Sequence, residues 1–123
     1  MPKVTMYYRS TAITGANLAK VGHYLRSRVS EMMSTHNVSL VKGDVDFIPI
    51  PLPKGSLVLS PFSFEIETIG FPERVAKFAD GTLLEIFKEQ LQSRLPKMHF
   101  QTETQKKALL IWLKYVSPDG PHV

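Results

Sequence analysis

The sequence predicts an α+β fold in which two β-α-β units form one four-stranded sheet with two helices on one face. Three observations lead to this prediction. Strand-like alternation of apolar and polar residues opens the chain and returns near residue 62. Apolar residues recur with helical spacing over about 16–35 and 72–95. Each helical segment lies between two strand-like segments, so the β-α-β layout occurs twice. The length of 123 residues suits one domain, which we expect over residues 1–123.

The first unit begins with a strand over Lys3–Arg9. Its alternation places one set of side chains on each face: Pro2, Val4, Met6 and Tyr8 on one, and Lys3, Thr5, Tyr7 and Arg9 on the other. Pro2 suits the start of a strand because proline has no N–H to donate to a sheet. A helix over about 16–35 follows, with Thr14 or Asn17 as its N-cap.

The second strand of this unit covers Val45–Ile50 and runs into three alternating prolines, Pro49, Pro51 and Pro53. Alternate residues of a strand aim their N–H groups at the same edge, so these prolines remove the hydrogen-bond donors from one edge. The segment is therefore either an edge strand protected from aggregation or a polyproline II segment that leaves the sheet.

The second unit contains the clearest strand. Four of its residues face one side and three the other: Phe62, Phe64, Ile66 and Thr68 against Ser63, Glu65 and Glu67. A second helix begins at Pro72 and ends before Pro96, with Gly81 inside it at a cost of about 1 kcal/mol relative to alanine. Its predicted buried residues are Val75, Phe78, Ala79, Thr82, Leu83, Ile86 and Leu91.

The last apolar segment, ALLIWLKYV at 108–116, completes the second unit. Its length and its aromatic and β-branched content indicate a strand, although its spacing also suits a helix.

Composition limits the classes of function. With 43% hydrophobic and 21% charged residues, the chain has the balance of a globular domain. It has no cysteine, which removes disulfides and thiol nucleophiles and fits a reducing compartment, so we expect the cytoplasm. The four histidines form no ligand-spaced pair, and we expect no metal. The longest apolar run, ALLIWL, is too short to span a membrane, and no signal peptide is predicted.

The net charge of +4 favours an anionic partner. Nucleic acid is the less favoured of the anions, because the sequence lacks an RNP-type string and offers only four aromatic residues that are candidates for stacking on bases: Tyr7, Tyr8, Phe62 and Phe64. The charge therefore favours a small anionic substrate as the partner.

Three short segments carry a family resemblance. MP leads directly into the first strand, VKGDVDFIPI at 41–50 holds a lysine-bearing loop before the second strand, and a strand over 62–69 ends in Ile69-Gly70 before the second helix. In these features the chain resembles the tautomerase superfamily of 4-oxalocrotonate tautomerase, 5-carboxymethyl-2-hydroxymuconate isomerase and macrophage migration inhibitory factor. The resemblance implies a tautomerase-like fold and a homotrimer. A ferredoxin-like fold has the same order of elements and is the alternative.

The resemblance also implies a site. In that family the amine of an N-terminal proline moves a proton between carbon and oxygen of an enol or dienol. The matching residue is Pro2, which becomes a secondary amine if Met1 is removed. Lys42 matches the loop lysine that some members place beside the proline, and Ile69 matches a residue whose backbone lines the pocket. Trp112 falls where members often carry pocket residues and suits the wall of a pocket for an aromatic substrate.

Arg9 is a second candidate for holding a substrate carboxylate, because a guanidinium binds carboxylate bidentately. It lies at the far end of the first strand and on the face opposite Pro2, which argues against a direct partnership within one subunit.

We therefore predict a keto–enol tautomerase or isomerase of a small 2-oxo or dienol acid, with Pro2 as the proton shuttle and no metal or organic cofactor. The alternative is a non-catalytic binding or structural protein with a tautomerase-like or ferredoxin-like fold. A retained Met1 favours the alternative, because the nitrogen of Pro2 is then an amide and has no basic lone pair.

Overall fold

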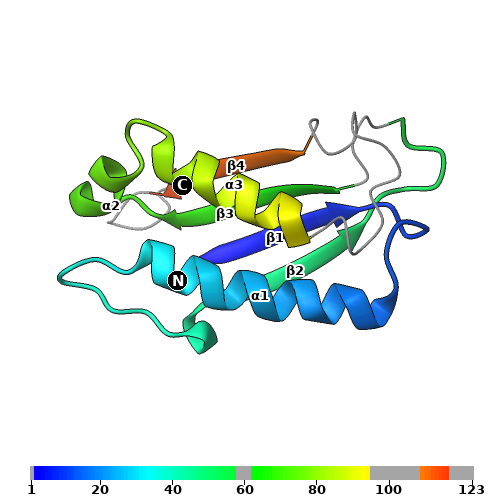
Figure 1. Cartoon of the computed structure of the whole chain (residues 1–123), viewed down its shortest axis with the longest axis horizontal. Helices are drawn as coiled ribbons and strands as arrows, with labels where there is room; N and C mark the ends of the chain where they lie inside the picture. Colours follow the sequence, from blue (N-terminus) through cyan, green and yellow to red (C-terminus); the bar gives the residue numbers. More distant parts are fainter. Residues whose placement is uncertain (1, 58–61, 95–108, 117–123) are drawn as a thin grey trace, which may run out of the picture.

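The computed structural model describes residues 2–57, 62–94 and 109–116. Its elements are β1 (Lys3–Tyr8), α1 (Gly15–Met33), a 3-10 turn η1 (Lys42–Asp44), β2 (Asp46–Pro51), β3 (Phe62–Ile69), α2 (Pro72–Lys77), α3 (Thr82–Arg94) and β4 (Leu110–Val116). Four strands form one sheet, and the helices cover one of its faces (Figure 1). The predicted α+β class is confirmed, and the last segment is a strand rather than a helix.

The sheet has the strand order β2-β1-β3-β4. β1 is parallel to β2, β3 is parallel to β4, and the two central strands β1 and β3 are antiparallel. Each β-α-β unit thus keeps its own two strands as direct neighbours. A ferredoxin-like fold instead splits the two strands of each unit with a third strand, so the ferredoxin-like alternative is wrong.

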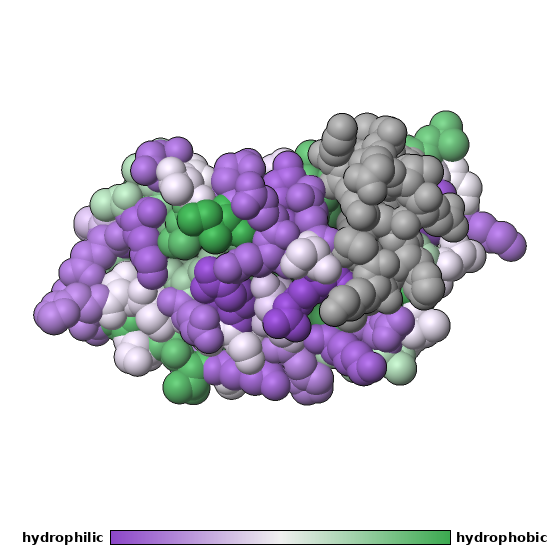
Figure 2. Space-filling model, in the orientation of Figure 1, coloured by the Kyte–Doolittle hydropathy of each residue, from purple (hydrophilic) through white to green (hydrophobic). Residues whose placement is uncertain are grey.

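The core lies between the helices and the covered face of the sheet. The strands contribute Val4, Met6, Phe62, Phe64 and Ile66, and the helices contribute Leu25, Val29, Met32, Phe87 and Leu91. The outer surface of the helices is mostly hydrophilic (Figure 2). Alternating strand residues and helical stripes therefore bury their apolar sides against each other, as the sequence pattern predicts.

Helix α1 follows its predicted course. The predicted cap Thr14 accepts a hydrogen bond from the backbone N–H of Asn17 at 3.2 Å. The helix comes very close to β2 at Gly22, where an added Cβ would lie 2.7 Å from Cδ2 of Phe47. Glycine at this position therefore allows the ring of Phe47 to pack directly on the helix backbone.

Strand β2 is an edge strand, and its prolines face outward. The N–H groups of Asp46 and Leu52 point toward β1, where they donate to the carbonyl oxygens of Pro2 and Tyr8. Because donors alternate along a strand, residues 49, 51 and 53 aim at the free edge, and all three are proline. The edge-strand interpretation is thus confirmed for residues 46–51, and this edge offers a partner strand only the N–H of Phe47.

The prediction of one long second helix is wrong. The helix breaks into α2 and α3 around Gly81, which has a φ of +77° that favours glycine. Val75, Ala79, Thr82 and Ile86 are exposed, whereas Phe78 and Leu91 are buried as predicted and Leu83 is half-buried. Arg74 and Phe87 occupy buried positions that the single-helix pattern did not predict.

Candidate functional site

Pro2 is buried at the start of the central strand β1. Its carbonyl oxygen accepts the N–H of Asp46 at 3.1 Å, which ties it to β2 on one side. On the other side, Lys3 of β1 pairs with Glu67 of the antiparallel strand β3. Continuing this register by one residue places Pro2 opposite Thr68. Pro2 is therefore held between two strands, on the sheet face that the helices cover.

A buried cation lies next to this position. Arg74 of α2 is only 2% exposed, and its Nη1 donates a hydrogen bond to Oγ1 of Thr68 at 2.8 Å. The same guanidinium donates to the carbonyl oxygens of Met33 at 2.9 Å and Ile69 at 3.1 Å. Its partners in the described part of the chain are neutral oxygens and the ring of Phe71, 5.2 Å away, so its positive charge is not neutralised there by a carboxylate.

Titratable groups around Thr68 show the effect of this enclosure. Burial lowers the pKa of Arg74 from its ordinary value, and the negative charge of the ionised Tyr115 side chain acts in the opposite direction. Burial likewise raises the pKa of Tyr115, which pairs with Thr68 across β3 and β4, and the Arg74 charge partly opposes that rise. A cation in such surroundings disfavours a second positive charge nearby.

Two other predicted residues lie at the same end of the sheet. Lys42 is exposed in η1, directly before β2 begins beside Pro2, and Ile69 ends β3. The turn that carries Lys42 is held by Asp44, whose Oδ2 accepts the N–H of Val41 at 2.8 Å. Figure 1 shows the start of β1, the segment before β2, and α2 at one end of the molecule. The structure thus brings the elements of Pro2, Lys42, Ile69 and Arg74 together.

Arg9 and Trp112 lie elsewhere. Arg9 follows the far end of β1, seven residues from Pro2, or about 23 Å at the usual rise of a strand. Trp112 pairs with Glu65 in the middle of β4 and points to the open face of the sheet, where it is 51% exposed. Within one subunit, neither residue shares the Pro2 end of the sheet.

The open face of the sheet, which carries no helix, has apolar side chains on both outer strands. They are Ile48 and Ile50 on β2 and Leu110 and Trp112 on β4. Polar residues of the central strands lie between them, including Lys3 and Glu67, whose charged groups are 3.4 Å apart. Exposed apolar rows on a sheet face are typical of surfaces that pack against another surface.

Arg74 is the site residue that the sequence prediction missed. One signal for it was present, because Arg74 lies four residues before the buried Phe78 and so shares its side of a helix.

The described residues contain no cluster of three metal-ligating side chains. Among them, too, none of the helices has the length and apolar character needed to cross a bilayer.

Similarity to known proteins is structural. No protein-family model matches the chain, and no curated protein matches it by sequence. A macrophage migration inhibitory factor-like protein from Entamoeba histolytica matches with a TM-score of 0.65 and 11% identity over 99% of this chain and 94% of that chain. A fused 4-OT symmetric trimer matches with a TM-score of 0.64 and 12% identity over 98% and 90% of the two chains.

A third match is N1, a member of the cis-3-chloroacrylic acid dehalogenase family, with a TM-score of 0.60 and 13% identity over 94% of this chain and 75% of that chain. At these identities the likeness establishes a shared fold. The strand order described above and these matches agree, so the predicted architecture is confirmed.

Proposed function

We propose that this chain, which has the fold of the tautomerase superfamily, is a keto–enol tautomerase of a small 2-oxo or dienol acid. The observation that carries the proposal is the burial of Pro2 at the start of β1, next to Thr68 and the buried charge of Arg74. A base must be neutral at the working pH, and a nearby cation together with burial favours a neutral amine.

The reaction needs one proton to move twice. The neutral secondary amine of Pro2 accepts the proton of the enol hydroxyl, and the resulting ammonium delivers a proton to the carbon of the former double bond. The amine is regenerated and the keto acid is released. Lys42 is the proposed partner for the carboxylate, because it is exposed at this end of the sheet and has no ion-pair partner among the described residues.

The first test is the intact mass of the protein from its native source, followed by an ultraviolet assay of phenylpyruvate enol ketonisation. We expect a mass lower by one methionine residue, which makes Pro2 the first residue, and catalysed ketonisation. A mass that retains Met1 would leave Pro2 as an amide and overturn the proton shuttle. That outcome would favour a non-catalytic binding protein with the same fold.

We also propose that the open face of the sheet packs between copies of the chain in a homotrimer. The apolar residues of β2 and β4 on that face support this packing. The prolines leave the β2 edge with one donor, which disfavours strand pairing between subunits along that edge. Arg9 would then act on a substrate only if it met the Pro2 end of another subunit.

Sedimentation velocity tests the assembly. We expect a particle of three 13.9 kDa chains, about 42 kDa, and a shift to the monomer in Trp112→Glu, which places a carboxylate on the packed face. Ile86→Glu is the matched control, because Ile86 is an exposed apolar residue on α3, away from that face. A trimer that survives Trp112→Glu unchanged would contradict this packing.

A further inference from the structure

A pocket lies at the end of the sheet opposite Pro2, outside the carboxyl ends of the parallel neighbours β1 and β2. Its volume is about 490 Å³, which is within the usual range for small-molecule sites. The lining residues come from two short segments, Arg9–Thr11 after β1 and Leu52–Ser56 after β2. Ligands of sheets with parallel strands commonly bind outside the carboxyl ends of those strands.

The charge of this pocket is entirely positive. Arg9 and Lys54 line it, and no acidic residue does. Two other pockets differ in this respect: Asp46 accompanies Arg26 in the one between α1 and β2, and Glu31 accompanies two arginines in the one between α1 and α3. Neither the guanidinium of Arg9 nor the ammonium of Lys54 has a hydrogen-bond or ion-pair partner within residues 2–57, 62–94 and 109–116. Two cations therefore face one cavity without a counter-charge from the described residues.

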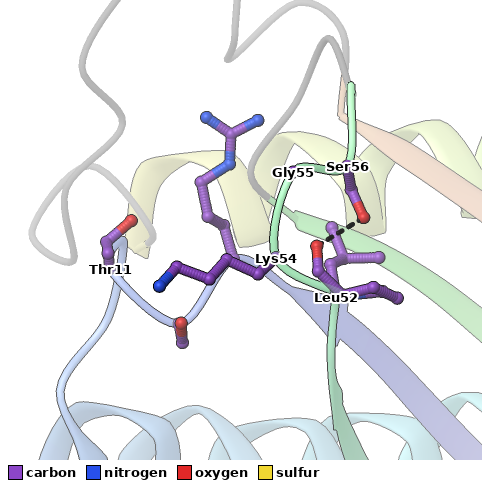
Figure 3. A pocket seen from close by; sticks show the side chains of 8 residues that line it. Thr11, Leu52, Lys54, Gly55 and Ser56 are labelled. Atoms are coloured by element: carbon purple, nitrogen blue, oxygen red, sulfur yellow. Dashed lines mark hydrogen bonds between the residues drawn. The ribbon is translucent and has the colours of Figure 1, made fainter.

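Hydroxyl groups add neutral donors to the two cations. Ser10 and Thr11 lie in the β1–α1 loop with exposed side chains. In Figure 3 the side chain of Lys54 extends toward the loop that carries Thr11, so the two segments face the same space. Leu52 and Pro53 supply an apolar wall beside these polar groups.

Backbone hydrogen bonds hold both segments in place. Ala12 donates to the carbonyl of Arg9 at 2.9 Å, and Leu52 donates to the carbonyl of Tyr8 at 2.7 Å, which joins the two segments. Ser56 closes the second turn through its N–H and its Oγ, both donated to the carbonyl of Pro53. The pocket walls are therefore arranged before a ligand arrives, which lowers the entropic cost of binding.

We infer that this pocket binds the phosphate group of a small phosphate monoester, at a site separate from Pro2. A phosphate monoester carries a charge of about −1.5 to −2 at pH 7, which matches two cations. The guanidinium of Arg9 takes two phosphate oxygens, Lys54 acts as a point charge, and the hydroxyls of Ser10 and Thr11 donate to the remaining oxygens. The volume beyond the phosphate, beside Leu52 and Pro53, accommodates the organic part.

The test is an NMR titration of the full chain at constant ionic strength with glycerol 3-phosphate, inorganic phosphate and malonate. We expect saturable shifts of the Ser10, Thr11 and Gly55 amides with glycerol 3-phosphate. Arg9→Gln and Lys54→Gln should each weaken its binding about tenfold. Lys20→Gln is the matched control, because it removes the same charge from an exposed position on α1 that does not line the pocket.

Three outcomes would overturn the inference. They are shifts that do not saturate, an equal loss of binding in Lys20→Gln, and malonate binding as tightly as glycerol 3-phosphate, which would assign the pocket to carboxylates. The titration is repeated with Pro2→Ala, in which we expect unchanged phosphate binding. Failure of this site and failure of the proposed tautomerase activity are therefore distinguishable.

Discussion

Replacing Pro2 by alanine is expected to lower kcat/KM for phenylpyruvate ketonisation by about 10²-fold or more. A positioned general acid or base contributes about 10²–10⁴-fold. Alanine at the first position keeps a primary amine but loses the ring that holds the nitrogen against β2 and β3. The reaction needs the neutral amine, so kcat/KM of the unchanged protein should rise as pH increases through the pKa of that amine. Steady-state rates measured across pH test both statements.

A second variant, with a non-cleavable residue added before Pro2, tests directly whether the Pro2 nitrogen takes part in the reaction. It keeps the proline ring and its packing but converts the nitrogen into an amide, so we expect it to lose all proline-dependent activity. Thermal unfolding of both variants checks that the fold survives. Full activity in the extended variant would show that the Pro2 nitrogen takes no part in the chemistry, whatever the result for Pro2→Ala.

Replacing Arg74 by methionine is expected to lower the free energy of unfolding by about 3 kcal/mol or more. Methionine fills a similar volume but removes the hydrogen bonds to the carbonyls of Met33 and Ile69 and to Oγ1 of Thr68. The carbonyl of Ile69 keeps the N–H of Phe71, whereas the other two acceptors lose the donor that Arg74 supplied. A buried polar group left unsatisfied costs about 1–3 kcal/mol. Urea unfolding followed by circular dichroism measures the loss.

Arg74 is also part of the contact between two helices. Together with Lys77, whose Nζ donates to the carbonyls of Met32 and Ser34, it covers the C-terminal end of α1. Cations at a helix C-terminus satisfy its free carbonyls and interact favourably with the helix dipole. Burial is the main cause that lowers the pKa of Lys77, with the charges of Arg28 and Arg74 adding to it.

Two control variants distinguish the loss of the buried Arg74 hydrogen bonds from the general effect of removing an arginine. Arg28→Met removes a hydrogen bond to Gln90 and an ion pair with Glu31 near the surface, and should cost less than about 1 kcal/mol. Arg74→Lys should give an intermediate loss, because lysine keeps the charge but lacks the planar fork that reaches several acceptors. Equal losses for Arg74→Met and Arg28→Met would contradict the proposed contribution of the buried hydrogen bonds.

Local patterns predicted most of the fold. The alternation in β1 and β3 identified both their buried faces, because side chains of a strand point to opposite sides of the sheet. Thr14 capped α1 as expected, since capping depends on residues three positions apart. The long second helix was the main error: glycine is tolerated within a helix at a small cost, so its presence alone does not predict the positive φ that Gly81 adopts.

The sequence by itself determined the strands, the first helix, the buried face of β1 with Pro2, and the proline-protected edge of β2. Each depends on the chemistry of residues that are close in the chain. Only the tertiary structure decided that β1 lies between β2 and β3, that Arg74 meets Thr68 opposite Pro2, and that Arg9 and Lys54 share a pocket at the other end. These groups lie on separate elements, and their meeting depends on strand order and helix packing, which local periodicity does not specify.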